Sequence, residues 1–567
     1  MTKYVFVVGG VMSGVGKGTA SASIARILKE HGYNVTVIKI DPYVNYDAGT
    51  LRPTEHGEVW VTEDGGEIDQ DLGTYERFLN EKIPKKNNLT TGQIYKNLIE
   101  KERKGLFLGK TVQFIPHVLD EIKSRIKEAS HESEIAVIEI GGTIGDYENI
   151  PFLLAAKTLE TEIGKENVAF VLVSYLPVPF NLKEAKTKPT QHAMKMLWEH
   201  GILPDFILCR SHGPLDEVRR KKIFEFLNID IEKVISAPDV DIIYSVPPNF
   251  EKENLGLKLL KELKLEARKQ PDWGKWNFLL QNLKNPEKEL NIAIIGKYLD
   301  IGSYTLEDAY ISISESLAHA GASLKVKPKI HWIDSKDFEK DDFKLQELKN
   351  YDGIIIPGGF GSTGIEGKIK VIKFVRENKI PFLGLCLGLQ LSVVEFARNV
   401  CNLSANTSEV DAKTDNSVID IMPHQKELME KSNYGATMRL GAYAAQIKEG
   451  SVVYNLYHAL NRLNEKGDLL DIQLGKTDLN KPFVIERHRH RYEVNPKYLE
   501  ILERNGFILS GWHIRLDDTK LVEFIELPRE KHPFFIATQA HPEFKSTFES
   551  PSPLFYGFLK ACSSKTI

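Results

Sequence analysis

The chain has 567 residues, of which 42% are hydrophobic and 27% charged, and its formal net charge is −4. This length is too great for one core and suggests several domains, and the balance of 74 basic against 78 acidic residues indicates neither a nucleic-acid-binding nor a membrane-surface protein. Its four cysteines lack zinc-like spacing and no apolar run approaches the ~20 residues of a membrane span, so we expect a cytoplasmic protein.

The first half of the chain alternates short apolar runs with amphipathic helical patterns. The runs that we predict as strands are Tyr4–Val8, Val35–Ile40, Ile135–Ile140, Val168–Tyr175, Phe206–Cys209 and Val234–Ala237. Strands without polar alternation, separated by helices, indicate a parallel sheet that is covered on both faces. We therefore predict an α/β protein whose first domain, residues 1–270, has a P-loop-like parallel sheet.

A glycine-rich loop, Gly9–Thr19, follows the first predicted strand and leads into a helix. Glycines let backbone N–H groups approach phosphate oxygens, and a helix start adds positive potential, so the pattern favours a phosphate site over a ligand-free turn. Lys17 would neutralise the outer phosphates, and Lys39, which lies in the second predicted strand, could reach the same ones. The residue after Lys17 is Gly18, where such loops normally carry the Ser or Thr that binds Mg²⁺.

Two acidic residues could supply the missing metal ligands. Asp71 lies in the segment Glu67–Gly73, and Glu139 lies near the end of an apolar strand before Gly141-Gly142. Carboxylates at the carboxyl ends of parallel strands point into the crevice where such folds bind ligands. The ordinary alternative for a single acidic residue is a solvated or ion-paired role. We predict that Asp71 and Glu139 bind Mg²⁺.

The α/β pattern pauses near residue 270 and restarts after residue 290. Residues 271–290 contain Pro271, Trp273, Trp276 and Pro286, and we interpret them as a linker. The strands that we predict beyond it are Asn291–Gly296, Lys329–Ile333, Gly353–Ile356, Pro381–Leu385 and Phe534–Thr538. Residues 405–417 are polar and typical of a loop. We predict a second α/β domain over residues 291–567.

Cys386 lies between a predicted strand and a helix, with Gly384 and Gly388 on either side. A tight turn of this kind needs small neighbours, and the helix start favours a reactive thiolate, although a buried structural cysteine is the commoner alternative. The sequence His541-Pro542-Glu543 could supply a base and the acid that orients it, while Gly358-Gly359-Phe360-Gly361 could donate N–H groups to an oxyanion. Together these features favour a nucleophilic thiol.

The motifs of the first half, in order, resemble the amidoligase domain of the CTP synthase family. They are Val8–Gly18, Lys39–Tyr43, His56–Glu58, Asp71–Phe78, Glu139–Asp146 and Lys186–Gln191. The thiol motifs resemble a class I glutamine amidotransferase domain, with Cys386 as nucleophile, His541 as base and Glu543 as its orienter. The resemblance implies that ATP phosphorylates the 4-oxygen of UTP and that ammonia from glutamine then displaces the phosphate to give CTP.

The resemblance also implies which residues contact each ligand. For ATP they are Gly14, Val15, Gly16, Lys17, Gly18, Thr19, Asp71 and Asp239. For UTP, or for CTP as a feedback inhibitor, they are Ser13, Asp146, Tyr147, Glu148, Lys186, Thr187, Lys188, Pro189, Thr190, Gln191 and Lys222. For glutamine they are Gly359, Leu387, Gly388, Leu389, Gln390, Glu409 and Arg491. Arg491 belongs to the basic cluster Glu486–Arg491, which is otherwise a solvated face or an anion site.

The resemblance further implies activation by GTP, a homotetramer with UTP sites built across subunits, and filaments. The chain departs from the family pattern at Thr363, where an arginine is usual, and at Arg52 and Ala540, so we expect altered regulation rather than lost activity. Three rivals are another glutamine-dependent ligase, a nucleotide-binding regulatory or filament-forming protein, and a partitioning-type P-loop ATPase. The segment Lys186–Gln191 argues against the first, and the set of catalytic residues argues against the other two.

Overall fold

The computed structural model describes residues 1–179, 184–227, 229–297, 307–359, 361–421 and 438–564, so Phe360 of the predicted oxyanion loop lies outside the described residues. The chain divides into two units. One contains Met1–Thr50 and Ile68–Asn277, and the other contains Leu51–Glu67 and Phe278–Ile567. In the described part of the chain, no helix combines the length and the apolar character that crossing a bilayer requires.

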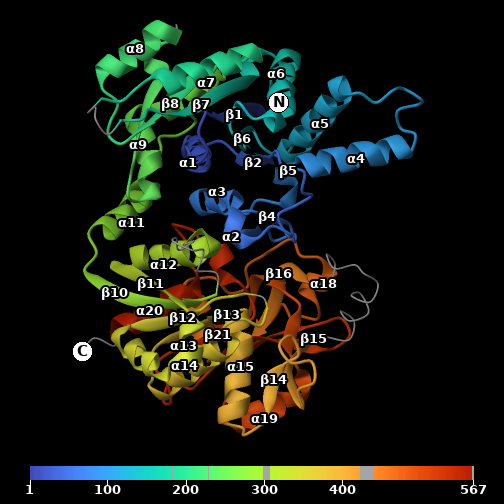
Figure 1. Ribbon diagram of the computed structural model, residues 1–567, viewed down its shortest axis with the longest axis vertical. Coiled ribbons are helices and arrows are strands. Elements are labelled where there is room, and N and C mark those ends of the chain that lie inside the picture. The colour runs from blue at the N-terminus through green and yellow to red at the C-terminus, as the bar shows by residue number, and fades with distance from the viewer. Residues whose placement is uncertain (180–183, 228, 298–306, 360, 422–437, 565–567) are drawn as a thin grey trace. The chain divides into compact units, whose positions relative to one another are not determined.

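The first unit is built on a parallel sheet of seven strands in the order β5-β2-β6-β1-β7-β8-β9 (Figure 1). The strands are β1 (Lys3–Gly9), β2 (Val35–Asp41), β5 (Asn88–Thr90), β6 (Ile135–Ile140), β7 (Val168–Tyr175), β8 (Phe206–Ser211) and β9 (Val234–Pro238). The helices are α1 (Lys17–Glu30), α3 (Asp71–Leu79), α4 (Thr91–Arg103), α5 (Leu119–Ser130), α6 (Ile150–Ile163), α7 (Lys188–Glu199), α8 (Glu217–Leu227), α9 (Val246–Lys252) and α10 (Leu255–Glu262).

All six strands predicted for the first half of the chain lie in this sheet. In β1, Phe6 and Val8 join a core cluster with Phe170 of β7, and the intervening Val5 and Val7 are buried as well. Because successive side chains of a strand point to opposite faces, both faces of β1 are covered. This double burial is the reason that these strands read as uninterrupted apolar runs.

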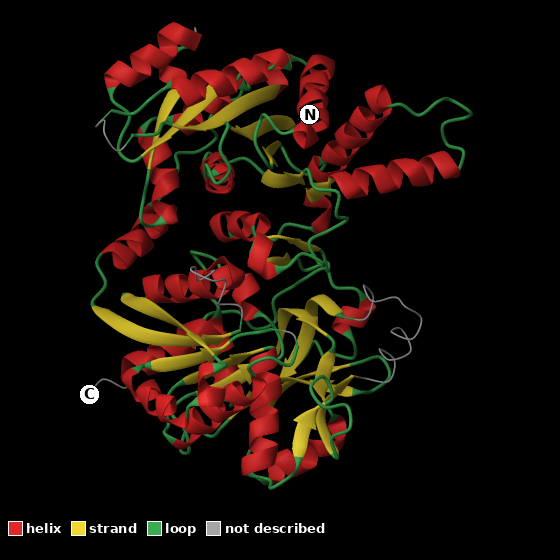
Figure 2. Ribbon diagram, viewed as in Figure 1, coloured by secondary structure: helices red, strands yellow, loops and turns green. Residues whose placement is uncertain are grey.

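The second unit contains a mixed sheet of nine strands in the order β11-β10-β12-β13-β21-β20-β19-β16-β17. Figure 2 shows the strands of the chain in yellow and its helices in red. The parallel strands are β10 (Lys288–Gly296), β11 (Val326–Asp334), β12 (Gly353–Ile356), β13 (Phe382–Leu385) and β21 (Phe535–Thr538). The antiparallel strands are β16 (Arg439–Ile447), β17 (Phe483–His490), β19 (Ile508–Ile514) and β20 (Lys520–Glu526). A small sheet holds β14 (Ala405–Thr407), β15 (Asn416–Ile421) and β18 (Tyr492–Val494).

The helices of the second unit are α12 (Ile311–Leu324), α13 (Asp337–Lys340), α14 (Ile365–Glu377), α15 (Leu387–Asn399), α17 (Val452–Ala459), α18 (Asp471–Leu474), α19 (Leu499–Arg504) and α20 (Pro553–Ser564). Along β10, Ile292 and Ile294 belong to one core cluster while Ala293 and Ile295 belong to another. The alternation places an apolar core on each face of the sheet.

Three features of the fold differ from the sequence-based expectation. Residues 405–417, predicted as a loop, contain β14 and the start of β15, and the antiparallel half of the large sheet was not predicted. Residues 271–290, interpreted as a linker, contain helix α11 (Gly274–Lys284) and the start of β10. Leu51–Glu67 packs with the second unit, although its place in the sequence assigns it to the first domain; it contributes α2 (Pro53–His56), β3 (Val59–Val61) and the first residue of β4 (Glu67–Asp69).

Candidate active sites

The glycine-rich loop connects β1 to α1 in the first unit. Gly14 and Gly16 have φ values of 70° and 87°, in the left-handed region that residues with a side chain rarely adopt. Gly16 also caps α1 without a side chain, so the N–H groups of the first helical turn receive no side-chain hydrogen bond from the cap. The loop and helix start therefore present backbone donors of the kind that bind phosphate.

Lys17 begins helix α1 and is 9% exposed. Its Nζ donates a hydrogen bond to the Gly142 carbonyl oxygen at 2.5 Å, just beyond β6. Burial lowers the pKa of the Lys17 ammonium, while the charges of Glu139 and Asp71 act in the opposite direction. An ammonium so placed can neutralise a phosphate bound to the loop.

Acidic residues surround Lys39 at the end of β2. Its Nζ forms ion pairs with Asp71, with Asp41 at 3.4 Å and with Glu139 at 3.7 Å. Burial disfavours the charge of Lys39, but the carboxylates of Asp41 and Asp71 outweigh burial and raise the pKa of Lys39 well above its ordinary value. Glu139 also accepts a hydrogen bond from the Tyr75 hydroxyl. Sequence reasoning missed Asp41 and Tyr75, although Asp41 is the last residue of β2.

The residues around Gly18 fit a magnesium ion. A Cβ atom on Gly18 would lie 2.7 Å from Asp71 Oδ1 and 3.8 Å from Glu139 Oε2, so both carboxylates face this position. Among the described residues, no group of three His, Cys, Asp or Glu side chains could hold a metal ion. Mg²⁺ needs only one or two carboxylates when phosphates and waters complete its octahedral shell. The two carboxylates thus occupy the space that a Ser or Thr side chain would take.

Replacing Gly18 with serine should therefore damage the site rather than restore a metal ligand. The added side chain would overlap Asp71 Oδ1, and a displaced ligand of this kind costs about 10²-fold in rate. The measurement is CTP formation from UTP and ATP with ammonia. Gly213→Ser is the matched control, because a Cβ at Gly213 meets nothing within 4 Å and this variant should keep its activity. Wild-type rates in Gly18→Ser would contradict the steric argument.

A pocket opens beside the glycine loop within the first unit. It is lined mostly by apolar groups of α1, β7, β8, β9 and α9, namely Gly16, Thr19, Ala20, Val173, Leu208, Arg210, Ala237, Pro238, Val246, Asn249 and Phe250. Arg210 Nη2 donates to Asp239 Oδ1 at 2.6 Å, so the predicted Asp239 anchors a cation at the pocket wall. Sequence reasoning missed Arg210, which lies near the carboxyl end of β8.

The residues predicted for UTP and CTP fall into two groups. The Lys186 ammonium lies 3.1 Å from the Glu184 carboxylate, which also forms an ion pair with Arg219 and interacts electrostatically with Lys222. Several cations therefore lie near the starts of α7 and α8. Thr190 and Gln191, in the first turn of α7 with Lys188 and Pro189, are buried. Of the second group, Asp146 accepts a hydrogen bond from the Thr143 N–H at 2.6 Å, while Ser13, Tyr147 and Glu148 are exposed.

Cys386 occupies a strained turn between β13 and α15 in the second unit. Its φ is 49° and its ψ is −97°, and its N–H donates to the Thr538 carbonyl oxygen at 2.7 Å. A Cβ on Gly384 would lie 2.8 Å from the Ala537 side chain, and one on Gly388 would lie 2.4 Å from the Ile356 carbonyl oxygen. The predicted need for small neighbours is therefore confirmed by the close approach of neighbouring strands.

His541 lies next to the cysteine and to Glu543. Its Nδ1 is 2.7 Å from Glu543 Oε1. A Cβ atom on Gly358 would lie 3.6 Å from His541 Nε2 and 3.5 Å from Cys386 Cβ, so the imidazole and the cysteine side chain meet at this glycine. Burial disfavours the imidazolium, but the charges of Glu543 and Cys386 outweigh burial and raise the pKa of His541 to about 10. This arrangement is the one that a cysteine nucleophile, its base and an orienting acid require.

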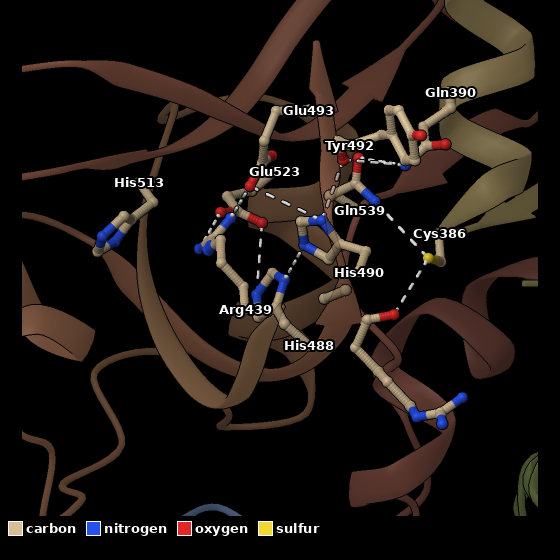
Figure 3. A network of polar contacts seen from close by, with 12 residues as sticks. Cys386, Gln390, Arg439, His488, His490, Tyr492, Glu493, His513, Glu523 and Gln539 are labelled. Atoms are coloured by element: carbon tan, nitrogen blue, oxygen red, sulfur yellow. Dashed lines mark hydrogen bonds and ion pairs between the residues drawn. The ribbon is translucent and has the colours of Figure 1, made fainter. Parts of the chain in front are cut away.

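Gly358 lies against both catalytic side chains. A Cβ there would lie 2.8 Å from His541 Cε1 and 3.5 Å from Cys386 Cβ, so only glycine fits without movement. Gln539 Nε2 is 3.7 Å from Cys386 Sγ (Figure 3). Sequence reasoning missed Gln539, although it is only two residues before His541.

The residues predicted for glutamine lie around this thiol. Leu387, Gly388, Leu389 and Gln390 form the first turn of α15, and Gln390 Nε2 donates to the Tyr492 carbonyl oxygen at 3.0 Å (Figure 3). Glu409 accepts a hydrogen bond from the Gly361 N–H at 2.8 Å, two residues beyond Gly359. Arg491 directly follows β17 and is partly buried.

The basic cluster Glu486–Arg491 is not a solvated face. Its first five residues belong to strand β17, and Arg487, His488 and His490 are buried. Behind the thiol, Arg439 bridges Glu493 at 3.1 Å and Glu523 at 2.8 Å, and His488 contacts His490 at 3.1 Å (Figure 3). Burial lowers the pKa of both histidines well below the ordinary value. Because the histidines are neutral and the charges are paired, most side chains of this cluster support the fold rather than bind an anion.

Known proteins resemble the chain over its whole length. Residues 3–265 match the family model described as CTP synthase N-terminus, and residues 305–561 match that of glutamine amidotransferase class-I. The CTP synthase of Pyrococcus furiosus is 50% identical over 562 residues, which cover 99% of this chain and 98% of that protein. The CTP synthase of Methanocaldococcus jannaschii is 48% identical over 571 residues, covering 100% and 99%.

One solved structure, the glutaminase domain of Trypanosoma brucei CTPS with bound acivicin, is 32% identical and covers 49% of this chain and 95% of that chain, with a TM-score of 0.41. Identity of about half of all residues across nearly the full length of both proteins does not arise by chance. The chain belongs to the CTP synthase family.

Proposed function

We propose that the two sites divide the reaction of a CTP synthase, which converts UTP to CTP with ATP as co-substrate and glutamine as nitrogen donor. The first unit activates UTP, and the second unit releases ammonia. One observation carries this division: a single chain holds a glycine loop with Lys17, Asp71 and Glu139, and also Cys386 in contact with His541.

In the first unit, the 4-oxygen of UTP attacks the γ-phosphorus of ATP, the bond to the β,γ-bridging oxygen breaks, and ADP leaves. Ammonia then adds to C4, and inorganic phosphate departs with the original oxygen to leave CTP. Lys17 and Lys39 neutralise the phosphate charge that builds up during transfer. Asp71 and Glu139 would hold Mg²⁺, which would supply positive charge that neutralises the phosphates. The mostly apolar lining of the pocket beside Arg210 suits the adenine base.

In the second unit, the Cys386 thiolate attacks the side-chain carbonyl carbon of glutamine. His541 takes the thiol proton and gives it to the departing ammonia, and Glu543 holds the imidazole in the required orientation. Backbone N–H groups of Gly359 and Leu387 stabilise the oxyanion, and Glu409 and Arg491 bind the substrate ammonium and carboxylate. Water then releases glutamate from the thioester and restores the thiol.

Our proposals on regulation and assembly rest on membership of the family. We propose that GTP stimulates glutamine hydrolysis, more weakly here because exposed Thr363 stands in place of an arginine, and that CTP inhibits. UTP sites built across the subunits of a tetramer, with filaments as a further assembly, agree with the exposure of Ser13, Tyr147 and Glu148. None of the four cysteines, all of which lie in the described part of the chain, forms a disulfide, and this agrees with a cytoplasmic protein.

An isotope experiment tests the phosphorylated intermediate. UTP carrying ¹⁸O at position 4 is converted with ATP, Mg²⁺ and ammonia, and the released phosphate is analysed by mass spectrometry. We expect one ¹⁸O atom in each phosphate released per CTP, because the uracil oxygen leaves bonded to phosphorus. Unlabelled UTP in ¹⁸O-water is the control and should give unlabelled phosphate. Label that appears in water instead of phosphate would rule out activation at this oxygen.

A further inference from the structure

Strand β17 connects the glutaminase site to Leu51–Glu67, a segment that comes from the other half of the sequence but packs in the same unit. Arg487 Nη1 donates a hydrogen bond to the Val61 carbonyl oxygen at 3.0 Å. Arg489 Nε donates to Glu67 Oε1 at 2.8 Å. Because the two arginines are two positions apart on one strand, their side chains leave the same face and reach the same segment.

The main chain of the same two arginines contacts the catalytic residues. The Arg487 carbonyl oxygen accepts a hydrogen bond from the His541 N–H at 2.7 Å. The Arg489 carbonyl oxygen lies 4.0 Å from Cys386 Sγ. Each arginine thus contacts the segment with its side chain and one member of the catalytic pair with its backbone.

Aromatic packing joins the segment to the base as well. The buried Trp60 ring lies 5.0 Å from the Phe544 ring, and Phe544 stacks on His541 with centroids 5.1 Å apart. The Arg487 guanidinium lies 5.2 Å from the centre of the Trp60 ring. The segment therefore packs behind His541 as well as against β17.

The ion pair between Arg489 and Glu67 is largely shielded from water, with side chains 15% and 10% exposed. Charge-assisted hydrogen bonds of this kind restrict position more strongly than neutral ones. Cys386 already has a strained backbone, and its distance to His541 must stay within hydrogen-bond range for proton transfer. Errors of about 1 Å in such geometry cost about 10²-fold in rate.

We propose that Arg489, held by its ion pair with Glu67, is a positioning residue for glutamine hydrolysis at Cys386 and His541. The ion pair fixes β17, and β17 sets the carbonyl groups against which the thiol and the imidazole are held. The inference rests on the proposed role of Cys386 as the nucleophile.

The test uses the full chain with Glu67→Gln, which removes the charge and keeps an acceptor, and Glu67→Ala, which removes both. The rate of glutamine hydrolysis is divided by the amount of Cys386 thiol, which is titrated with iodoacetamide. We expect this normalised kcat to fall about fivefold in Glu67→Gln and more than about tenfold in Glu67→Ala. The KM for glutamine and ammonia-dependent CTP formation should stay within about twofold. The pH profile of Cys386 alkylation should shift in both variants, which a loss of folded protein alone would not produce.

Glu395→Gln is the matched control. It removes the charge from another shielded ion pair of the same unit, Arg376 with Glu395 at 2.7 Å, on the helix that begins after Cys386. This control should keep kcat per titrated thiol. An equal loss in Glu395→Gln, an unchanged kcat in Glu67→Ala, or an equal loss of ammonia-dependent synthesis would overturn the proposal. Persistent glutamine-dependent synthesis in Cys386→Ala would instead overturn the proposed nucleophile.

Discussion

Replacing Cys386 with alanine should abolish glutamine-dependent CTP formation and leave ammonia-dependent formation within about twofold of the wild-type rate. Cys386 is the nucleophile that we propose for the covalent intermediate, and removal of a nucleophile from such a set costs about 10⁴-fold or more. The residues that we propose for the activation of UTP, such as Lys17 and Asp71, belong to the first unit and are left intact by this change. Both rates are followed as CTP absorbance with saturating UTP, ATP and Mg²⁺.

Cys401→Ala provides the matched control for this prediction. Cys401 is a free, partly buried thiol in the same unit, and its Sγ contacts only the Ile501 carbonyl oxygen among the described hydrogen-bonding groups, at 3.9 Å. We expect this variant to keep both activities. If Cys386→Ala lost ammonia-dependent synthesis to the same extent as glutamine-dependent synthesis, the division of labour between the two units would be wrong.

Replacing Lys17 with methionine should instead stop CTP formation from either nitrogen source. Methionine retains the apolar stem of the buried side chain but removes the charge that would neutralise the transferred phosphate. Loss of one charged group at a developing phosphate charge is expected to cost about 10³-fold. Glutamine hydrolysis in the absence of nucleotides should be unchanged, because Cys386, His541 and Glu543 belong to the other unit.

Lys123→Met tests whether the loss follows from removing any buried lysine. The Lys123 side chain is 7% exposed and pairs with Asp120 and Glu162 on helices of the first unit. The measurement is CTP formation from ammonia by the Lys123→Met variant. We expect the rate per folded protein molecule to stay at the wild-type level. Synthesis that survives in Lys17→Met, or that falls equally in Lys123→Met, would argue against a phosphate-neutralising role for Lys17.

Local sequence patterns predicted the parallel strands because burial on both faces leaves a recognisable apolar run. The same reasoning failed for β17, whose sequence contains Glu486, Arg487 and His488 and reads as solvated. These polar groups can be buried because they form hydrogen bonds and ion pairs with residues from distant parts of the chain. Arg487, for example, donates a hydrogen bond to the carbonyl oxygen of Val61, 426 positions away. No local pattern contains that information, since a compensated charge and a solvated charge look alike in sequence.

The sequence by itself determined which chemical groups stand at the ends of the strands: a glycine loop with Lys17, a carboxylate at Glu139, and a thiol at Cys386. Residue type, strand ends and helix starts are local properties, so they can be inferred without a fold. Only the tertiary structure decided which of these groups meet. The order of strands in each sheet brings Lys39 among the carboxylates and places both Cys386 and His541 against Gly358. Such contacts depend on packing between segments far apart in the chain, and the number of residues between two segments does not predict their distance in space.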